Sequence, residues 1–231
     1  MRLIALSLPL LALAACSAEP QPEPTPEASP TVSGLRTLVA AGFREMALGA
    51  KIEGPQGPEV SDTLMFEGRT IAEMVSYVAC PAVALESETD IPAQPEPACD
   101  PATQPEGALY TYVHRITPGE GADGPVLSFR TARPATGFAN VIGFDREQAA
   151  AALGEDYAIG VSMDNGALVW RIEKGDGWDA GEEITLFWQS TLPPDGPSDV
   201  YEVETNEGRA MATGPFPPEE APDSRSGKPP E

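Results

Sequence analysis

A single histidine limits the acid–base chemistry available to this chain. His114 is the only histidine in 231 residues, and histidine is the side chain whose ordinary pKa lets it exchange a proton near neutral pH. Alternation along a predicted strand at 109–116 places His114 on the same face as Tyr110 and Tyr112. One interpretation is a general base beside a binding face. We expect the simpler one, a partly exposed strand histidine next to Arg115.

Carboxylates and one serine are two further candidates for catalysis. The 36 Asp and Glu residues guarantee that some pairs lie the ~5–10 Å apart that glycoside hydrolysis requires, so their abundance singles out no pair. Ser162 lies in the sequence GVSMD at 160–164, which lacks the second glycine of a nucleophile elbow. We therefore predict no catalytic residue, and a secreted hydrolase with a carboxylate active site is the alternative.

The Gly-rich segment 175–183, GDGWDAGEE, suggests both a cation site and a ligand site. Its carboxylates are hard oxygen ligands that suit Ca²⁺, but they lack the spacing of an EF-hand loop. We expect a solvated turn, no metal site and no cofactor, with a periplasmic carrier of calcium or a small ligand as a further alternative. Trp178 at the loop tip is the candidate ligand-binding residue, because tryptophan is enriched at binding hot spots. The other interpretation is that its ring folds back over a sheet edge.

The N-terminal sequence MRLIALSLPLLALAAC predicts export. After Arg2, residues 3–15 form an apolar run that is shorter than the ~20 residues needed to cross a bilayer and has the size of a signal-peptide core. Its ending, Leu13-Ala14-Ala15-Cys16, resembles the lipobox of bacterial lipoproteins. An ordinary signal peptide cut elsewhere, with Cys16 incidental, is the alternative.

The resemblance to bacterial lipoproteins implies a lipid anchor. It implies that residues 1–15 are cleaved off and that Cys16 is acylated on its thiol and on its new amino group. Two or more acyl chains are enough for stable membrane attachment. Ser17 resembles the residue that follows the lipidated cysteine in lipoproteins sent to the outer membrane. We therefore expect the bacterial cell envelope, on either face of the outer membrane.

Composition and charge divide the remaining chain. Residues 16–31 are a Pro- and Glu-rich linker, 32–213 are the predicted domain, and 214–231 are a Pro-rich acidic tail that we expect to be disordered. The net charge of −22 and the pI near 4.2 would repel a phosphate backbone, so we expect no nucleic-acid partner. The membrane contact is therefore expected to come from the lipid anchor alone.

Cys80 and Cys99 are predicted to form a disulfide. Export places them in an oxidising compartment, where a pair of thiols normally bonds. A structural zinc site usually needs four ligands, but with Cys16 assigned to the lipid no other cysteine remains, and the only histidine is His114. Closing this loop would stabilise the domain by ~3 kcal/mol through loop-closure entropy.

Apolar alternation predicts that the domain is mainly β. We expect about nine strands, near residues 63–66, 70–79, 109–116, 126–132, 138–144, 157–163, 167–172, 184–188 and 201–203. The Asn165-Gly166 pair predicts a tight hairpin turn, because both residues tolerate positive φ. That turn would place Leu168, Trp170 and Ile172 on one face with Val161 and Ile159 of the preceding strand.

Two helices are expected. Residues 146–153 are rich in alanine, Asp145 can cap them, Gln148 can reach back to the cap, and Gly154 can end the helix. A helical apolar stripe also runs through 34–48, although Gly42 lies within it.

The strands show no βαβ rhythm, which favours an antiparallel β-sandwich. The segment 181–194, GEEITLFWQSTLPP, resembles the closing strands of immunoglobulin-like modules in bacterial surface-anchored proteins, and this implies a surface module. We therefore expect an immunoglobulin-like β-sandwich with one or two short helices and one disulfide. The expected function is a non-enzymatic, lipid-anchored module that binds an envelope protein or glycan.

Overall fold

The computed structural model describes residues 34–82, 98–122 and 124–219. The predicted signal peptide 1–15, the predicted lipidation site Cys16 and the linker up to residue 31 lie outside the described residues, as do residues 220–231 of the predicted tail.

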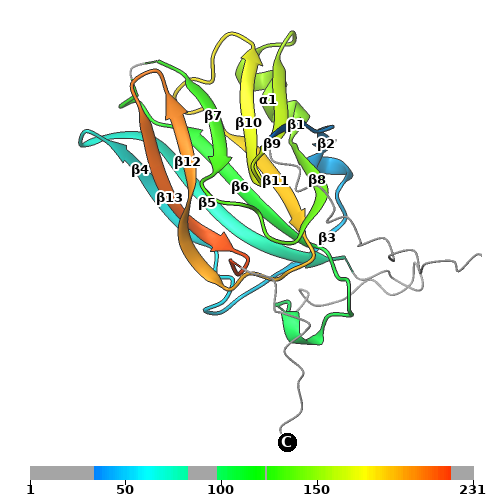
Figure 1. Cartoon of the computed structure of the whole chain (residues 1–231). Coiled ribbons are helices and arrows are strands. Elements are labelled where there is room, and N and C mark those ends of the chain that lie inside the picture. The colour runs from blue at the N-terminus through cyan, green and yellow to red at the C-terminus, as the bar shows by residue number, and fades with distance from the viewer. Residues whose placement is uncertain (1–33, 83–97, 123, 220–231) are drawn as a thin grey trace, which may run out of the picture. The chain divides into compact units, whose positions relative to one another are not determined.

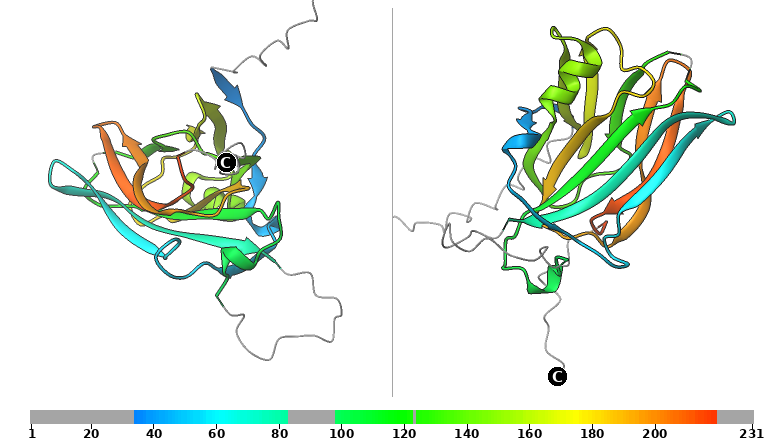
Figure 2. Two further views of the ribbon diagram at one scale, coloured as in Figure 1. Left: turned by 60° about the horizontal axis from the view of Figure 1, so that its bottom comes forward. Right: turned by 180° about the vertical axis from the view of Figure 1, so that it is seen from behind.

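Within the described ranges the chain forms thirteen strands in two sheets (Figure 1). The six-stranded sheet has the order β1 (Leu35–Thr37), β9 (Ala158–Asp164), β10 (Ala167–Lys174), β7 (Val126–Thr131), β12 (Gly196–Thr205), β13 (Arg209–Phe216). The seven-stranded sheet has the order β2 (Ala41–Gly42), β8 (Phe138–Phe144), β11 (Ile184–Ser190), β6 (Tyr110–Pro118), β5 (Arg69–Pro81), β3 (Leu48–Lys51), and β4 (Val60–Phe66) also pairs with β5. The two sheets lie face to face (Figure 2), which confirms the predicted β-sandwich. All paired strands are antiparallel except β2 and β8.

Aromatic side chains from alternate positions of the facing strands fill the space between the sheets. Phe129, Trp170 and Tyr201 come from the six-stranded sheet, and Tyr112 and Trp188 from the seven-stranded one, and all five are buried. The rings of Tyr112 and Trp188 stack at 4.3 Å between centroids. Trp170 Nε1 also donates a 2.9 Å hydrogen bond to the Gly143 carbonyl of β8, which ties one sheet to the other.

His114 lies at the centre of this core. The predicted face is confirmed, because Tyr112 and His114 both point inward from β6, but the expected partial exposure is wrong. Trp188 Nε1 donates to His114 Nε2 across 3.2 Å, and Ser76 Oγ lies 2.8 Å from His114 Nδ1. The indole can only donate, so the histidine proton lies on Nδ1 and bonds the serine oxygen. Both ring nitrogens are therefore satisfied in the neutral form, and burial lowers the pKa of His114 to about 3.

Local sequence signals predicted the hairpin and the helix. Asn165 and Gly166 have φ of 49° and 86°, and the register pairs Trp170 with Val161 and Ile172 with Ile159, as expected. Helix α1 (Arg146–Leu153) is capped by the Asp145 carboxylate, which accepts from the amides of Glu147 and Gln148. The Gln148 side chain does not reach back to the cap. It accepts from the Thr185 amide of β11 at 2.7 Å, so it fixes α1 to the sheet.

The helix predicted at 34–48 is wrong. This segment instead contains β1, β2 and the short 3₁₀ helix η1 (Phe43–Glu45). A helix would have needed a core to cover its stripe, and Leu35 and Val39 of that stripe are 73% and 91% exposed. The backbone pairs with sheet edges instead. Gly143 of β8 permits this, because a Cβ there would lie 2.0 Å from the Ala41 carbonyl oxygen.

The predicted domain boundary at residue 213 is also wrong. Strand β13 continues to Phe216, whose ring is 1% exposed and packs on Trp188 and Tyr201. Strands β1, β2, β3 and β13 account for the count above nine. They escape prediction because they are short or carry glycine and proline, and sheet pairing stabilises them more than their own composition does.

The predicted disulfide between Cys80 and Cys99 is confirmed. It joins the end of β5 to the segment before the 3₁₀ helix η2 (Pro101–Thr103). The Cys99 amide also donates to the Lys51 carbonyl at 2.9 Å, so the disulfide and the backbone hold this segment together against β3. Residues 83–97 of the enclosed loop lie outside the described residues.

Truncating Phe216 tests whether the C-terminal strand belongs to the core. We expect Phe216→Ala to lower the free energy of unfolding by about 3–5 kcal/mol, the usual cost of removing a buried phenylalanine ring. Met65→Ala is the matched control, because Met65 is half exposed and its loss should change stability by about 0.5 kcal/mol or less. Urea denaturation measures both. Equal, small effects would show that the domain ends before Phe216.

The buried histidine predicts a specific pH dependence of stability. An unfolded histidine titrates near ~6.5, whereas folded His114 stays neutral down to about 3. Between these values only the unfolded chain gains the proton, so stability falls as pH falls. We expect the wild-type chain to lose about 2 kcal/mol more than His114→Gln between about pH 7.5 and about pH 5. Urea denaturation at both pH values measures this difference, and an identical pH slope in the two proteins would contradict the assignment.

Candidate functional site

Trp178, the predicted ligand-binding residue, does not present its ring to solvent. Its side chain is 1% exposed, and its Nε1 donates a 2.7 Å hydrogen bond to the Glu182 carbonyl. Its own carbonyl accepts from the Val126 amide of β7 at 3.1 Å. The ring therefore packs into the core and closes the loop 175–183, and the prediction that it recognises a ligand is wrong. The alternative interpretation, that it folds back over the sheet, is the correct one.

The carboxylates of the same loop serve the loop itself. The Asp179 amide donates to Glu182 Oε2 at 2.9 Å, so this carboxylate satisfies the backbone of its own turn. Across residues 34–82, 98–122 and 124–219, no group of three or more His, Cys, Asp or Glu residues could hold a metal ion.

The other catalytic candidates are not brought together. His114 is enclosed in the core, whereas Ser162 lies on β9 facing the outside of the six-stranded sheet. Hydrogen bonds lower the pKa of two carboxyl groups. Lys51 donates to Glu59, and Ser128 donates to Glu204. A general acid needs the opposite shift, because it must stay protonated near neutral pH.

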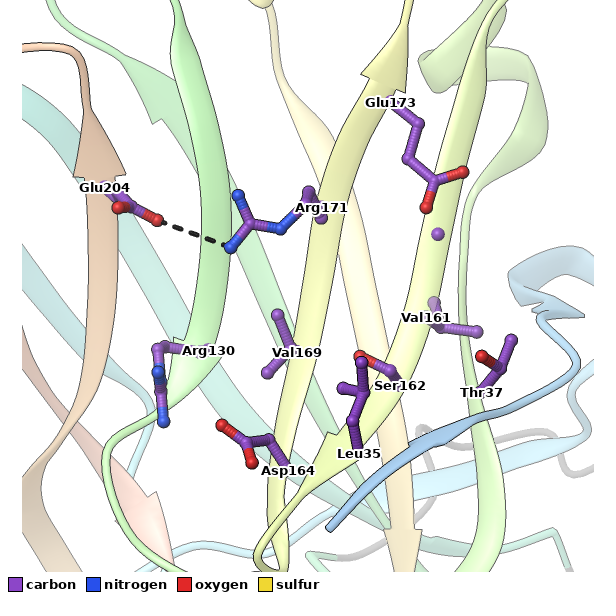
Figure 3. Close-up of a pocket in the computed structure, with 11 residues that line it drawn as sticks. Leu35, Thr37, Arg130, Val161, Ser162, Asp164, Val169, Arg171, Glu173 and Glu204 are labelled. Carbon is purple, nitrogen blue, oxygen red and sulfur yellow. Dashed lines mark ion pairs between the residues drawn. The ribbon is translucent and has the colours of Figure 1, made fainter.

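The outer face of the six-stranded sheet carries a groove of about 250 Å³ that is lined by both polar and apolar side chains (Figure 3). We call it the sheet groove. Its lining comes from β1, β9, β10, β7 and β12, namely Leu35, Thr37, Arg130, Gly160, Val161, Ser162, Asp164, Val169, Arg171, Glu173 and Glu204.

Strand register explains why these residues meet. Residues directly opposite each other on neighbouring strands point to the same side of a sheet. Val169 lies opposite Ser162 on one side and Arg130 on the other. Arg171 likewise lies opposite Gly160 and Ser128, and Ser128 lies opposite Glu204. Because Trp170 of β10 points into the core, its neighbours Val169 and Arg171 must point outward into the groove.

One wall of the groove is held by Glu204. Ser128 Oγ donates a 2.7 Å hydrogen bond to Glu204 Oε2, and Arg209 and Arg171 lie 3.4 and 3.8 Å from its carboxylate oxygens. The hydrogen bond from Ser128, followed by the two guanidinium groups, keeps the pKa of Glu204 below its usual value, although partial burial opposes the shift. Glu204 is therefore an ionised, pre-paired group that fixes the position of Arg171.

Two charged groups of the groove lack such partners. In the described part of the chain, no carboxylate lies within ion-pair distance of Arg130, and its one hydrogen bond is a 3.4 Å contact from Nε to the Thr131 carbonyl. Glu173 has neither a hydrogen bond nor an ion pair within the same residues. Its carboxylate lies over Gly160, where a Cβ would approach Glu173 Oε1 to 2.2 Å. Figure 3 shows Arg130 and Asp164 at one end of the groove and Glu173 at the other.

Exposed apolar side chains lie on the same face. Leu35 lines the groove and is 73% exposed. Met211 of β13 is 44% exposed and lies opposite Glu202, which itself lies opposite Arg130, so all three point to the outer side of the sheet. The groove thus combines unpaired charges with accessible apolar surface.

Comparison with known proteins gives no relative from which a function could be transferred. No protein-family model matches the chain, and neither a curated protein nor a solved structure matches it. No helix within the described ranges is long and apolar enough to cross a membrane. The geometry of the sheet groove is therefore the basis on which a function can be argued.

Proposed function

We propose that this protein is a non-enzymatic binding module of the bacterial envelope, anchored through Cys16, and that the sheet groove is its ligand site. One observation carries the second part of the proposal. Arg130 and Glu173 line the groove without an ion-pair partner among the described residues, beside the exposed side chain of Leu35. A bound ligand would lower the free energy of such a surface relative to its hydrated state, because the ligand pairs the charges and covers the apolar atoms.

The scaffold supports a role in binding. The groove is built on five paired strands, so its lining is held by backbone hydrogen bonds and by a rigid core beneath it. Sites on strands are positioned more firmly than sites on loops, and this lowers the entropic cost of binding. The lipid anchor would keep such a module close to other envelope components, which raises their effective concentration at the groove.

Filling the groove tests the ligand site. Ser162→Trp places a large ring in the groove on a strand position that faces outward, so we expect the fold to remain and the binding of solubilised envelope material to fall at least tenfold, about 1.4 kcal/mol. Thr63→Trp is the matched control, because Thr63 is likewise a small hydroxyl residue in the middle of a strand that faces outward, in the other sheet. Pull-down with the full-length chain measures the loss. Equal capture by wild type and both variants would contradict the assignment of the site.

Removing the lipidated cysteine tests the anchor. We expect Cys16→Ala to move the protein from the membrane fraction to the soluble fraction, because no acyl chains can then be attached. Ser17→Ala is the control that leaves the cysteine in place. Fractionation of cells followed by detection of the domain measures the distribution. Persistent membrane attachment of Cys16→Ala would show that the lipid anchor does not hold the protein.

A further inference from the structure

We infer that the ligand of the sheet groove is a net-basic polypeptide segment that carries a carboxylate for Arg130. This inference rests on the proposed function and names the class of its ligand. It follows from the charges of the groove taken together with the charge of the whole chain.

The net charge of the chain selects the overall charge of the partner. At −22 the protein produces a negative field that attracts basic partners and repels acidic ones, and this field acts before contact. Within the groove, Glu173 and Asp164 continue the same preference at short range, because Glu173 has no cation of the described residues beside it. A lysine or arginine of the ligand would supply that cation.

The guanidinium of Arg130 requires one negatively charged group in the otherwise basic ligand. Its guanidinium lines the groove with no carboxylate of the described chain within ion-pair distance, so binding a ligand would take water away from it without compensation. A carboxylate satisfies a guanidinium with two parallel hydrogen bonds, which are among the stronger contacts in proteins. The ligand must therefore be mixed in charge, basic overall with one acid in register with Arg130.

Polypeptide fits these requirements better than an uncharged glycan. An uncharged glycan would leave both Arg130 and Glu173 without a counter-charge. It also has few apolar groups that could cover the exposed side chains of Leu35 and Met211. A peptide supplies aliphatic side chains for those two residues as well as both signs of charge. Its length also suits a groove in which Arg130 and Glu173 lie at opposite ends, as Figure 3 shows.

The test uses three synthetic peptide libraries on the immobilised full-length chain. The first has peptides of about 12 residues with four Lys, one Asp and the rest drawn from Ala, Leu and Ser in random order. The second has Asn in place of Asp, and the third has all charges inverted. Mass spectrometry of the retained peptides measures binding. The chain is used as wild type, as Arg130→Gln, and as Arg146→Gln, a control that removes the same charge from an exposed residue of α1 outside the groove.

We expect wild type to retain the Asp library about tenfold better than the Asn library, the factor that one charge-assisted pair provides. This preference should disappear in Arg130→Gln and persist in Arg146→Gln, and the inverted library should not bind. Retention of the inverted library, or the same Asp preference with Arg130→Gln, would overturn the inference. If no library binds but Ser162→Trp still abolishes envelope capture, the groove is a binding site for another class of ligand and only this inference fails. If that variant also has no effect, the proposed function fails with it.

Discussion

The two sheets meet through an aromatic layer, and the position of every other residue depends on this contact. Trp188, His114 and Tyr201 lie at its centre, with the rings of His114 and Tyr201 4.2 Å apart across the interface of the two sheets. Because a strand points successive side chains to opposite faces, residues that turn toward this layer force their neighbours outward. The inner contact therefore determines which residues are left to form a surface. The sheet groove is therefore lined by residues whose neighbours along each strand point into the aromatic layer.

Polar groups in such a core are tolerated only when each finds a partner, and the His114 network shows how this is achieved. The indole of Trp188 donates to one ring nitrogen, and the Ser76 hydroxyl lies at the other. A second proton on the ring would place two donors against each other at a position that is not exposed to solvent, which reinforces the effect of burial that lowers the pKa of His114. The only histidine of the chain thus serves the packing of the fold, not proton transfer to a substrate.

Local chemistry made part of this structure predictable. The Asn165-Gly166 turn, the Asp145 cap and the inward alternation of β6 and β10 are decided within a few residues, and these three features are confirmed, whereas the contact of Gln148 and the exposure of His114 are not as expected. The disulfide of Cys80 was predictable from the number of cysteines and the expected export. The predictions that were wrong concern features that depend on residues far away in the sequence. Strand β2 exists because Gly143, about a hundred residues further along, leaves room for it, and Trp178 is held against Val126 of β7, about fifty residues earlier in the chain.

The groove could not be predicted for the same reason. The outward positions of β10 were visible in the pattern around Trp170, but nothing local says that β7 lies beside β10 or that β12 lies beside β7. Only that order brings Arg130, Arg171 and Glu204 onto one surface. These three residues contribute little to the packing of the core, because the outward and inward side chains of each strand contact different surroundings. Arg130 can therefore be exchanged without disturbing Phe129, which packs against Trp170 and Tyr201 on the other side of the sheet. Substitutions on this surface can therefore leave the core beneath it unchanged.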